Sequence, residues 1–224
     1  MRQELRPFSG ILPDRQLRRI EQTWNHGQLL ETGWLHIVNH MVATAALAYA
    51  MTRLITYSYK TECICACAVH DFWKRMLIEH ADANGGHDFG WIDSQTDRQE
   101  KLLSGCGWDK RTVRAALCAS LDTLRLYERA SGSLPLYAVI VFLADCLVNN
   151  SEFTDIGGRI VYLRERYPGL DTEGQRHYRL SSPTLTVLKR AANSMLRAVS
   201  AHAGMKPGRF LETAFENARQ LLAA

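Results

Sequence analysis

The sequence predicts an all-α protein, and three observations support this prediction. Apolar residues recur at helical spacing in most segments, as in residues 35–54, where Ala, Leu and Met return every three or four positions. Glycines such as Gly105, Gly107 and Gly132 separate these segments. The sequence contains no alternating apolar and polar pattern typical of a half-buried strand, and it shows no internal repeat or low-complexity tract.

The helices can be placed in order along the chain. Capping residues, apolar spacing and breakers predict the first helices at residues 14–23 and 35–54, and Thr61 is the predicted cap of the next helix, which carries His70. Further helices are predicted at 97–104, 109–129 and 135–150. The last two run from Pro183, in the first turn, to about His202 and over 209–222. The stretch 82–90 is rich in Gly, Asn and Asp and predicts a loop, and Tyr167-Pro168-Gly169 predicts a turn.

Length and composition indicate one globular domain that spans residues 1–224. The chain is 46% hydrophobic and 22% charged, which is ordinary usage for a packed core. The sequence has no apolar run of membrane-spanning length, and its first residues lack the apolar segment of a signal peptide. We therefore expect a cytoplasmic protein without a membrane partner.

Charge and cysteine usage narrow the function classes. The net charge of +4 suits an anionic ligand, but the sequence lacks the dense basic stripe typical of nucleic-acid binding. Six cysteines lie mostly in apolar helical contexts, which favours packing over disulfides or metal binding. In the run Cys63-x-Cys65-x-Cys67, only the first and last share a helix face, so it lacks a tetrahedral thiolate set.

Polar residues interrupt three separate apolar segments. His40, the pair His70-Asp71 and Asp145 each stand where burial is costly unless the side chain is hydrogen-bonded, charge-paired or bound to a metal. A helical bundle can bring such positions together, and mixed imidazole and carboxylate ligands suit Fe, Mn, Ni or Zn. The sequence predicts one or two divalent transition-metal ions; a buried hydrogen-bonded network without metal and His36 as the first ligand are the alternatives.

These residues, in this order, resemble the HD-domain superfamily of metal-dependent phosphohydrolases. Residues 34–48 are similar to its first helix, residues 68–74 to its His-Asp signature with a lysine three positions later, and residues 142–145 to its final aspartate. The resemblance implies an HD-domain helical bundle with its core at about residues 34–150, extended by N-terminal and C-terminal helices. It also implies metal-dependent hydrolysis of a phosphate compound.

A narrower resemblance concerns residues 134–160. This segment is similar to the bacterial HD-type diadenosine tetraphosphate hydrolases, whose pattern Asn150, Glu152 and Phe153 follow. Ser151 stands where that family has an arginine, and residues 119–122 lack the histidine that the family has there. The resemblance makes diadenosine tetraphosphate the first substrate to test.

Within this interpretation, the residues around the signature receive roles. Asp71 has two carboxylate oxygens and could bridge two ions as a catalytic group. His80 and His87 are candidate ligands of a second ion, and the alternative is a pair of solvated histidines. Lys74 lies about one helical turn after Asp71, where it would contact a substrate phosphate or pair with Asp71 or Glu79.

Two arginines are further candidates for substrate binding, and the sequence leaves more than one function open. Arg125 and Arg159 are candidate phosphate-binding residues, with a solvated helix face as the alternative for each. The leading hypothesis is a phosphohydrolase that acts on a nucleotide or another small phosphate ester or anhydride. A di-iron oxygenase on the same scaffold and a degenerate scaffold with a binding role are the alternatives. Nucleic acid is not an expected partner, and the chain is compatible with a homodimer.

Overall fold

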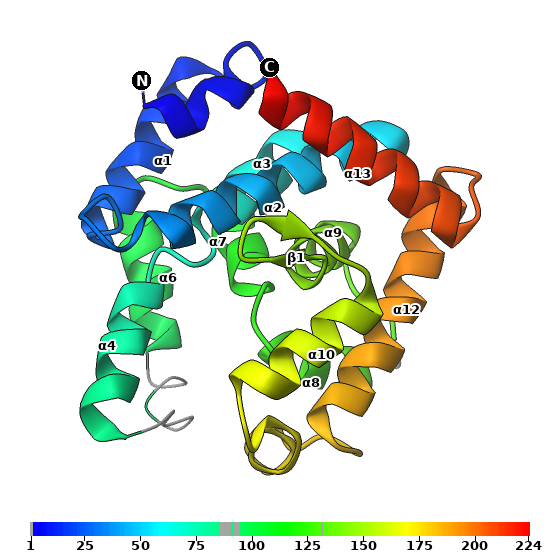
Figure 1. Cartoon of the computed structure of the whole chain (residues 1–224). Helices are drawn as coiled ribbons and strands as arrows, with labels where there is room; N and C mark the ends of the chain where they lie inside the picture. The colour runs from blue at the N-terminus through cyan, green and yellow to red at the C-terminus, as the bar shows by residue number, and fades with distance from the viewer. Residues whose placement is uncertain (1, 86–90, 92–94, 131) are drawn as a thin grey trace.

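The computed structural model describes residues 2–85, 91, 95–130 and 132–224, and helices dominate it (Figure 1). This confirms the predicted all-α class. In chain order, the elements are η1 (Gln3–Phe8), α1 (Asp14–His26), α2 (Leu35–Leu54), α3 (Lys60–Val69), α4 (Lys74–Asn84), α6 (Thr96–Gly105), α7 (Lys110–Leu117), α8 (Asp122–Arg129), α9 (Leu136–Cys146), β1 (Val148–Asn149), β2 (Glu152–Phe153), α10 (Ile156–Arg166), η2 (Leu170–Gly174), α11 (Gln175–Tyr178), α12 (Thr184–His202) and α13 (Pro207–Ala223).

Helix α2 is the central element of the fold. Residues 40–48 of α2 are all buried, because α3, α9 and α13 pack around it. A helix that is apolar around most of its circumference is suited to such a position. Helix α13 crosses α2 and also contacts η1, which brings the two chain ends to the same side of the molecule (Figure 1).

Helix α3 leads directly into the predicted His-Asp signature. It is packed by α1, α2, α7 and α9, so that Cys65 is buried as well as Cys63 and Cys67, which share the other face. The helix begins at Lys60 and ends at Val69, and the chain then turns through residues 70–73 before α4 begins. The predicted cap was therefore wrong, because Tyr59 precedes the helix and no side chain caps its first turn.

The predicted helix at residues 109–129 is interrupted. It divides into α7 and α8, and Asp109 accepts hydrogen bonds as the cap of α7. Between the two helices, the hydroxyl of Ser120 donates to the carbonyl of Leu117, and that of Thr123 donates to the carbonyl of Cys118. These bonds satisfy backbone groups that a continuous helix would have paired internally, and this ends α7.

The predicted helix at 135–150 also ends early. Helix α9 stops at Cys146, and the antiparallel pair β1–β2 follows, with Val148 opposite Phe153. Asn150 has a positive φ of 56° in the turn of this hairpin, a conformation that asparagine tolerates better than most residues. Neither the hairpin nor the next helix, α10, was predicted.

The C-terminal helices agree with the prediction within two residues. Pro183 is the cap residue just before α12, whereas the prediction placed it in the first turn of the helix. Helix α12 ends at His202, as predicted. Buried apolar side chains from Leu5 to Ala218 form one continuous cluster that includes residues from both ends of the chain. Among the described residues, no helix combines the length and the apolar character that crossing a bilayer requires.

Candidate metal centre

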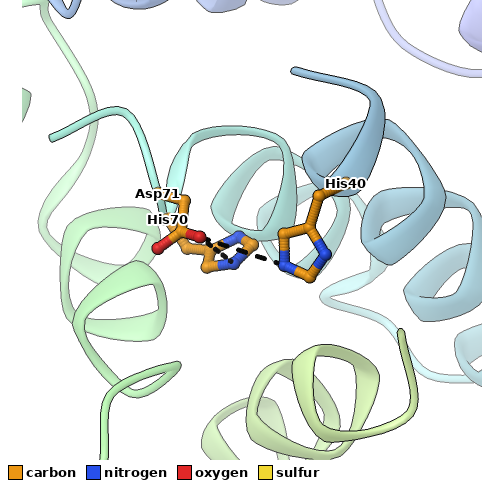
Figure 2. Close-up of side chains that lie close together, drawn as sticks. All are labelled: His40, His70 and Asp71. Atoms are coloured by element: carbon orange, nitrogen blue, oxygen red, sulfur yellow. Dashed lines mark ion pairs between the residues drawn. The ribbon is translucent and has the colours of Figure 1, made fainter. Parts of the chain in front are cut away.

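The four polar residues that interrupt apolar segments converge at one point. His40 comes from the buried face of α2, His70 and Asp71 from the turn between α3 and α4, and Asp145 from the last turn of α9. The Nε2 atoms of His40 and His70 lie 3.0 and 3.3 Å from Oδ1 of Asp145. They lie 4.0 and 3.8 Å from Oδ2 of Asp71, and Figure 2 shows both imidazoles with this carboxylate.

Backbone carbonyls orient both imidazole rings. Nδ1 of His40 donates to the carbonyl oxygen of Asn150 at 2.8 Å, and Nδ1 of His70 donates to that of Cys67 at 2.7 Å. A carbonyl oxygen can only accept, so these bonds assign the ring proton to Nδ1. In the neutral rings the lone pair is then on Nε2, on the side of the two carboxylates. Such an outer hydrogen bond on the second ring nitrogen is typical of metal-binding histidines.

Both carboxylates are ionised. Burial raises the pKa of Asp71, but Lys74, His70 and His40 lower it by more, and the pKa lies below the ordinary value. Burial also raises the pKa of Asp145, yet Arg159 and the two histidines hold it well below the usual range. Nitrogen lone pairs beside carboxylate oxygens repel one another, so the centre requires a cation. A metal ion and a proton on Nε2 both meet this requirement.

Each carboxylate also has one permanent cationic partner. Nζ of Lys74 lies 3.7 Å from Oδ2 of Asp71, and Nη2 of Arg159 lies 3.3 Å from Oδ2 of Asp145. Asp71 raises the pKa of Lys74, which keeps this amine protonated. For Arg159, burial lowers the pKa, but Asp145, Cys146, Tyr167 and Tyr162 together raise it by more, so the pKa lies above the ordinary value. The two cations cancel the charge of the two carboxylates.

The residues present fit a transition-metal ion. Nε2 of His70 is buried, and although it lies 3.3 Å from Asp145, it lacks hydrogen-bond geometry toward any described residue. Ligand atoms of His40, His70 and Asp71 lie within 4.8 Å of one another. Two atoms that share an ion at about 2.1 Å lie about 3.0–3.5 Å apart. The distances of 3.0 and 3.3 Å from the imidazoles to Asp145 fall in this range, and those of 4.0 and 3.8 Å to Asp71 are slightly longer. Two imidazoles with carboxylates are a ligand set that transition metals accept, and which metal binds stays a prediction.

The other histidine candidates lie apart from this cluster or outside the described residues. His36 is exposed on α2, where Nδ1 donates to the carbonyl of Gly33, so His40 and not His36 faces the centre. His80, on α4, stacks on Trp91 with ring centroids 3.6 Å apart and lies near Asn84. His87 lies outside the residues that the structure describes. The described residues thus bring together groups that could hold one ion, and a second ion stays a prediction.

The predicted basic residues differ in position. Lys74 and Arg159 both lie at the centre, and Arg159 is buried there, contrary to the solvated helix face that was its alternative. Arg125 is half-buried on α8, and no hydrogen bond or ion pair links it to the four residues of the centre.

Two contributions were missed by the sequence reasoning. The carbonyl of Asn150 orients His40 from 110 positions away. Neither the family-like pattern that Asn150 follows nor the turn-forming pair Asn149-Asn150 indicated this hydrogen bond. Gly27 packs against the carbonyl of Phe72 in the signature turn so closely that an added Cβ would lie 2.0 Å from the oxygen. A glycine after a helix predicts a cap, but it does not predict this contact.

Comparison with known proteins adds no family to this description. No family model matches the chain, and neither a curated protein nor a solved structure shows significant similarity to it. The argument for function therefore depends on the centre itself.

Proposed function

We propose that this protein is a metal-dependent phosphohydrolase that acts on a nucleotide or another small phosphate ester or anhydride. The observation that carries the proposal is the convergence of two Nε2 atoms and two ionised carboxylates, with a protonated amine 3.7 Å from one carboxylate. His40, His70, Asp71 and Asp145 would hold the ion. A bound divalent ion would supply a Lewis acid for the phosphoryl oxygens and an acidified water.

Charge balance supports an anionic substrate. Lys74 and Arg159 already offset the charges of Asp71 and Asp145, so that a divalent ion with neutral imidazoles leaves the centre with an excess positive charge. Hydrolysis of a phosphate places additional negative charge on the phosphoryl oxygens, and a fixed positive site stabilises that charge. A neutral or cationic substrate would gain nothing from this arrangement.

Exposure indicates the side from which a substrate would approach. The side chains of His70, Asp145 and His40 are 2%, 13% and 11% exposed, while those of Asp71 and Lys74 are 23% and 33% exposed. The approach is therefore from the Asp71–Lys74 side. Lys74 would contact a phosphate there, and Asp71 is the ionised group best placed to accept a proton from water.

Metal content and hydrolysis together test the proposal. Elemental analysis of the purified protein should find Fe, Mn, Ni or Zn, and the protein loaded with each metal should release phosphate or a nucleotide from a panel of mononucleotides, cyclic nucleotides and dinucleoside polyphosphates. His70→Ala and Asp71→Ala should lose both metal and activity. His36→Ala is the matched control, because it removes an exposed imidazole from the same helix as His40 and should change neither.

Lys74→Ala separates substrate binding from metal binding. It should lower kcat/KM by roughly 10- to 100-fold, since a charge-assisted contact to phosphate is lost, and should leave metal content unchanged. A metal-free wild-type protein, or full metal occupancy in Asp71→Ala, would refute the proposal. Metal binding with oxygen consumption and no hydrolysis would replace it with the oxygenase, and metal binding without either reaction would replace it with a binding scaffold.

A further inference from the structure

The two terminal nitrogens of Arg159 contact both the centre and the strand that follows it. It lies in the first turn of α10, and its side chain is 13% exposed. Nη2 lies 3.3 Å from Oδ2 of Asp145, while Nη1 donates to the carbonyl of Val148 at 3.1 Å and to Oδ1 of Asn149 at 3.2 Å. One guanidinium therefore links the end of α9 to strand β1.

These contacts reach two residues of the centre by different routes. Asp145 is held directly through its second oxygen, which leaves Oδ1 directed at the histidines. His40 is reached through the backbone, because Arg159 fixes Val148 and Asn149, and the next residue, Asn150, accepts the Nδ1 proton of His40 at 2.8 Å. Oδ1 of Asn150 in turn accepts from the Tyr162 hydroxyl at 3.5 Å, and Arg159 lies over the Tyr162 ring.

We propose that Arg159 is the positioning residue of the metal centre: by holding Asp145 and the β1 backbone together, it sets the geometry of Asp145 and His40 as ligands. This inference depends on the metal binding in the proposed function. It also assigns Arg159 a role other than the phosphate binding that the sequence suggested. The guanidinium is planar and offers several donors at fixed angles, so a lysine with the same charge cannot reproduce these contacts.

Comparison with Lys74 shows why the two cations differ in role. Lys74 has one ionic contact, with Asp71, and a third of its side chain is exposed. Arg159 has three polar contacts to other described residues, and its side chain is much more buried. The structure therefore favours Lys74 as the mobile cation for a substrate and Arg159 as the fixed cation for the ligands.

Metal affinity provides the test, independent of turnover. Wild-type protein and Arg159→Lys are stripped of metal and titrated with Co²⁺, and the visible absorption of bound Co²⁺ reports both affinity and ligand geometry. Loss of an outer contact to a metal ligand typically weakens metal affinity by about 10- to 100-fold. We expect Arg159→Lys to bind Co²⁺ that much more weakly than the wild type, with an altered absorption band.

Two further variants control for folding. Arg164→Lys makes the same substitution at an exposed position of the same helix, and it should leave both affinity and spectrum unchanged. Asn149→Ala removes a single neutral acceptor of Arg159 and should weaken Co²⁺ binding by roughly 2- to 10-fold even where Arg159→Lys fails to fold. Wild-type affinity and spectrum in Arg159→Lys, or in Asn149→Ala if the first is unfolded, would overturn the inference and leave the proposed function standing. A wild-type protein that binds no Co²⁺ would overturn both.

Discussion

Replacement of Gly27 by alanine tests how closely the signature turn is held against α1. Gly27 follows α1, and a Cβ at this position would lie 2.0 Å from the carbonyl oxygen of Phe72 and 3.1 Å from its carbonyl carbon. Its φ of −79° is open to any residue, so the substitution acts through this contact and not through backbone strain. Phe72 immediately follows Asp71, and a displaced carbonyl would move this predicted ligand.

The magnitude follows from the packing around the contact. The turn must retreat by about 1.4 Å to restore an ordinary van der Waals separation, and close-packed interiors resist such movement. Phe72 is buried, and the indole N–H of Trp24 donates to the carbonyl of Ala68 at 2.7 Å, which holds the preceding helix end against α1. Overpacking of this kind costs about 1–3 kcal/mol. A ligand misplaced by about 1 Å should also weaken metal binding by roughly 10- to 100-fold.

The assay compares Gly27→Ala with Gly208→Ala. An added Cβ at Gly208 in α13 meets no atom within 4 Å, so that this control should be neutral or up to about 1 kcal/mol more stable. Denaturant unfolding of the metal-free proteins measures stability, and Co²⁺ titration measures affinity. If Gly27→Ala matches the wild type in both, the turn is not held as described and the reasoning is refuted.

Two other predictions concern polar groups away from the centre. Burial raises the pKa of Asp109, but hydrogen bonds from Thr112 and Arg111 lower it by more, so the stabilisation from its charge is present at neutral pH and is lost as the pH falls through the lowered pKa. Asp109→Ala should therefore cost about 1 kcal/mol in denaturant unfolding at neutral pH and less at about pH 2, and an equal cost at both would contradict this. Burial raises the pKa of Cys63 to about 12, so native alkylation followed by peptide mass spectrometry should modify half-exposed Cys106 well before Cys63.

The centre was predictable from the sequence where side chains carried the information. His40, His70 and Asp145 stand out because a polar group inside an apolar helix is costly, and the structure places all three at one point. Helix α2 was predicted with its observed bounds, because Ala, Leu and Met recur at helical spacing from Leu35 to Leu54 and no Gly or Pro interrupts them. In each case, a strong local preference agrees with the tertiary arrangement.

The remainder depends on contacts between distant backbone groups, which leave little trace in the sequence. Every residue has a carbonyl, so the acceptor role of Asn150 has no signature of its own. Arg159 resembled an ordinary surface residue because helix α10 has charged residues on several sides, and its burial arises only when α10 packs beside β1. The break between α7 and α8 similarly reflects competition by Ser120 and Thr123 hydroxyls, which helical periodicity does not reveal.

The elements that carry the centre are held together by apolar packing and not by the ligands alone. Helices α2, α3 and α9 pack on one another through buried Ala, Cys, Val and Leu side chains, and His40, His70 and Asp145 lie at the end of this contact. Separately, backbone carbonyls orient both imidazoles, and Lys74 and Arg159 balance both carboxylates. In a site arranged in this way, the ligands are already ordered, so little of the free energy of metal binding is lost to ordering them. Metal binding should therefore add to the stability of an already folded chain by mass action, in contrast to zinc fingers, which fold only when metal is bound.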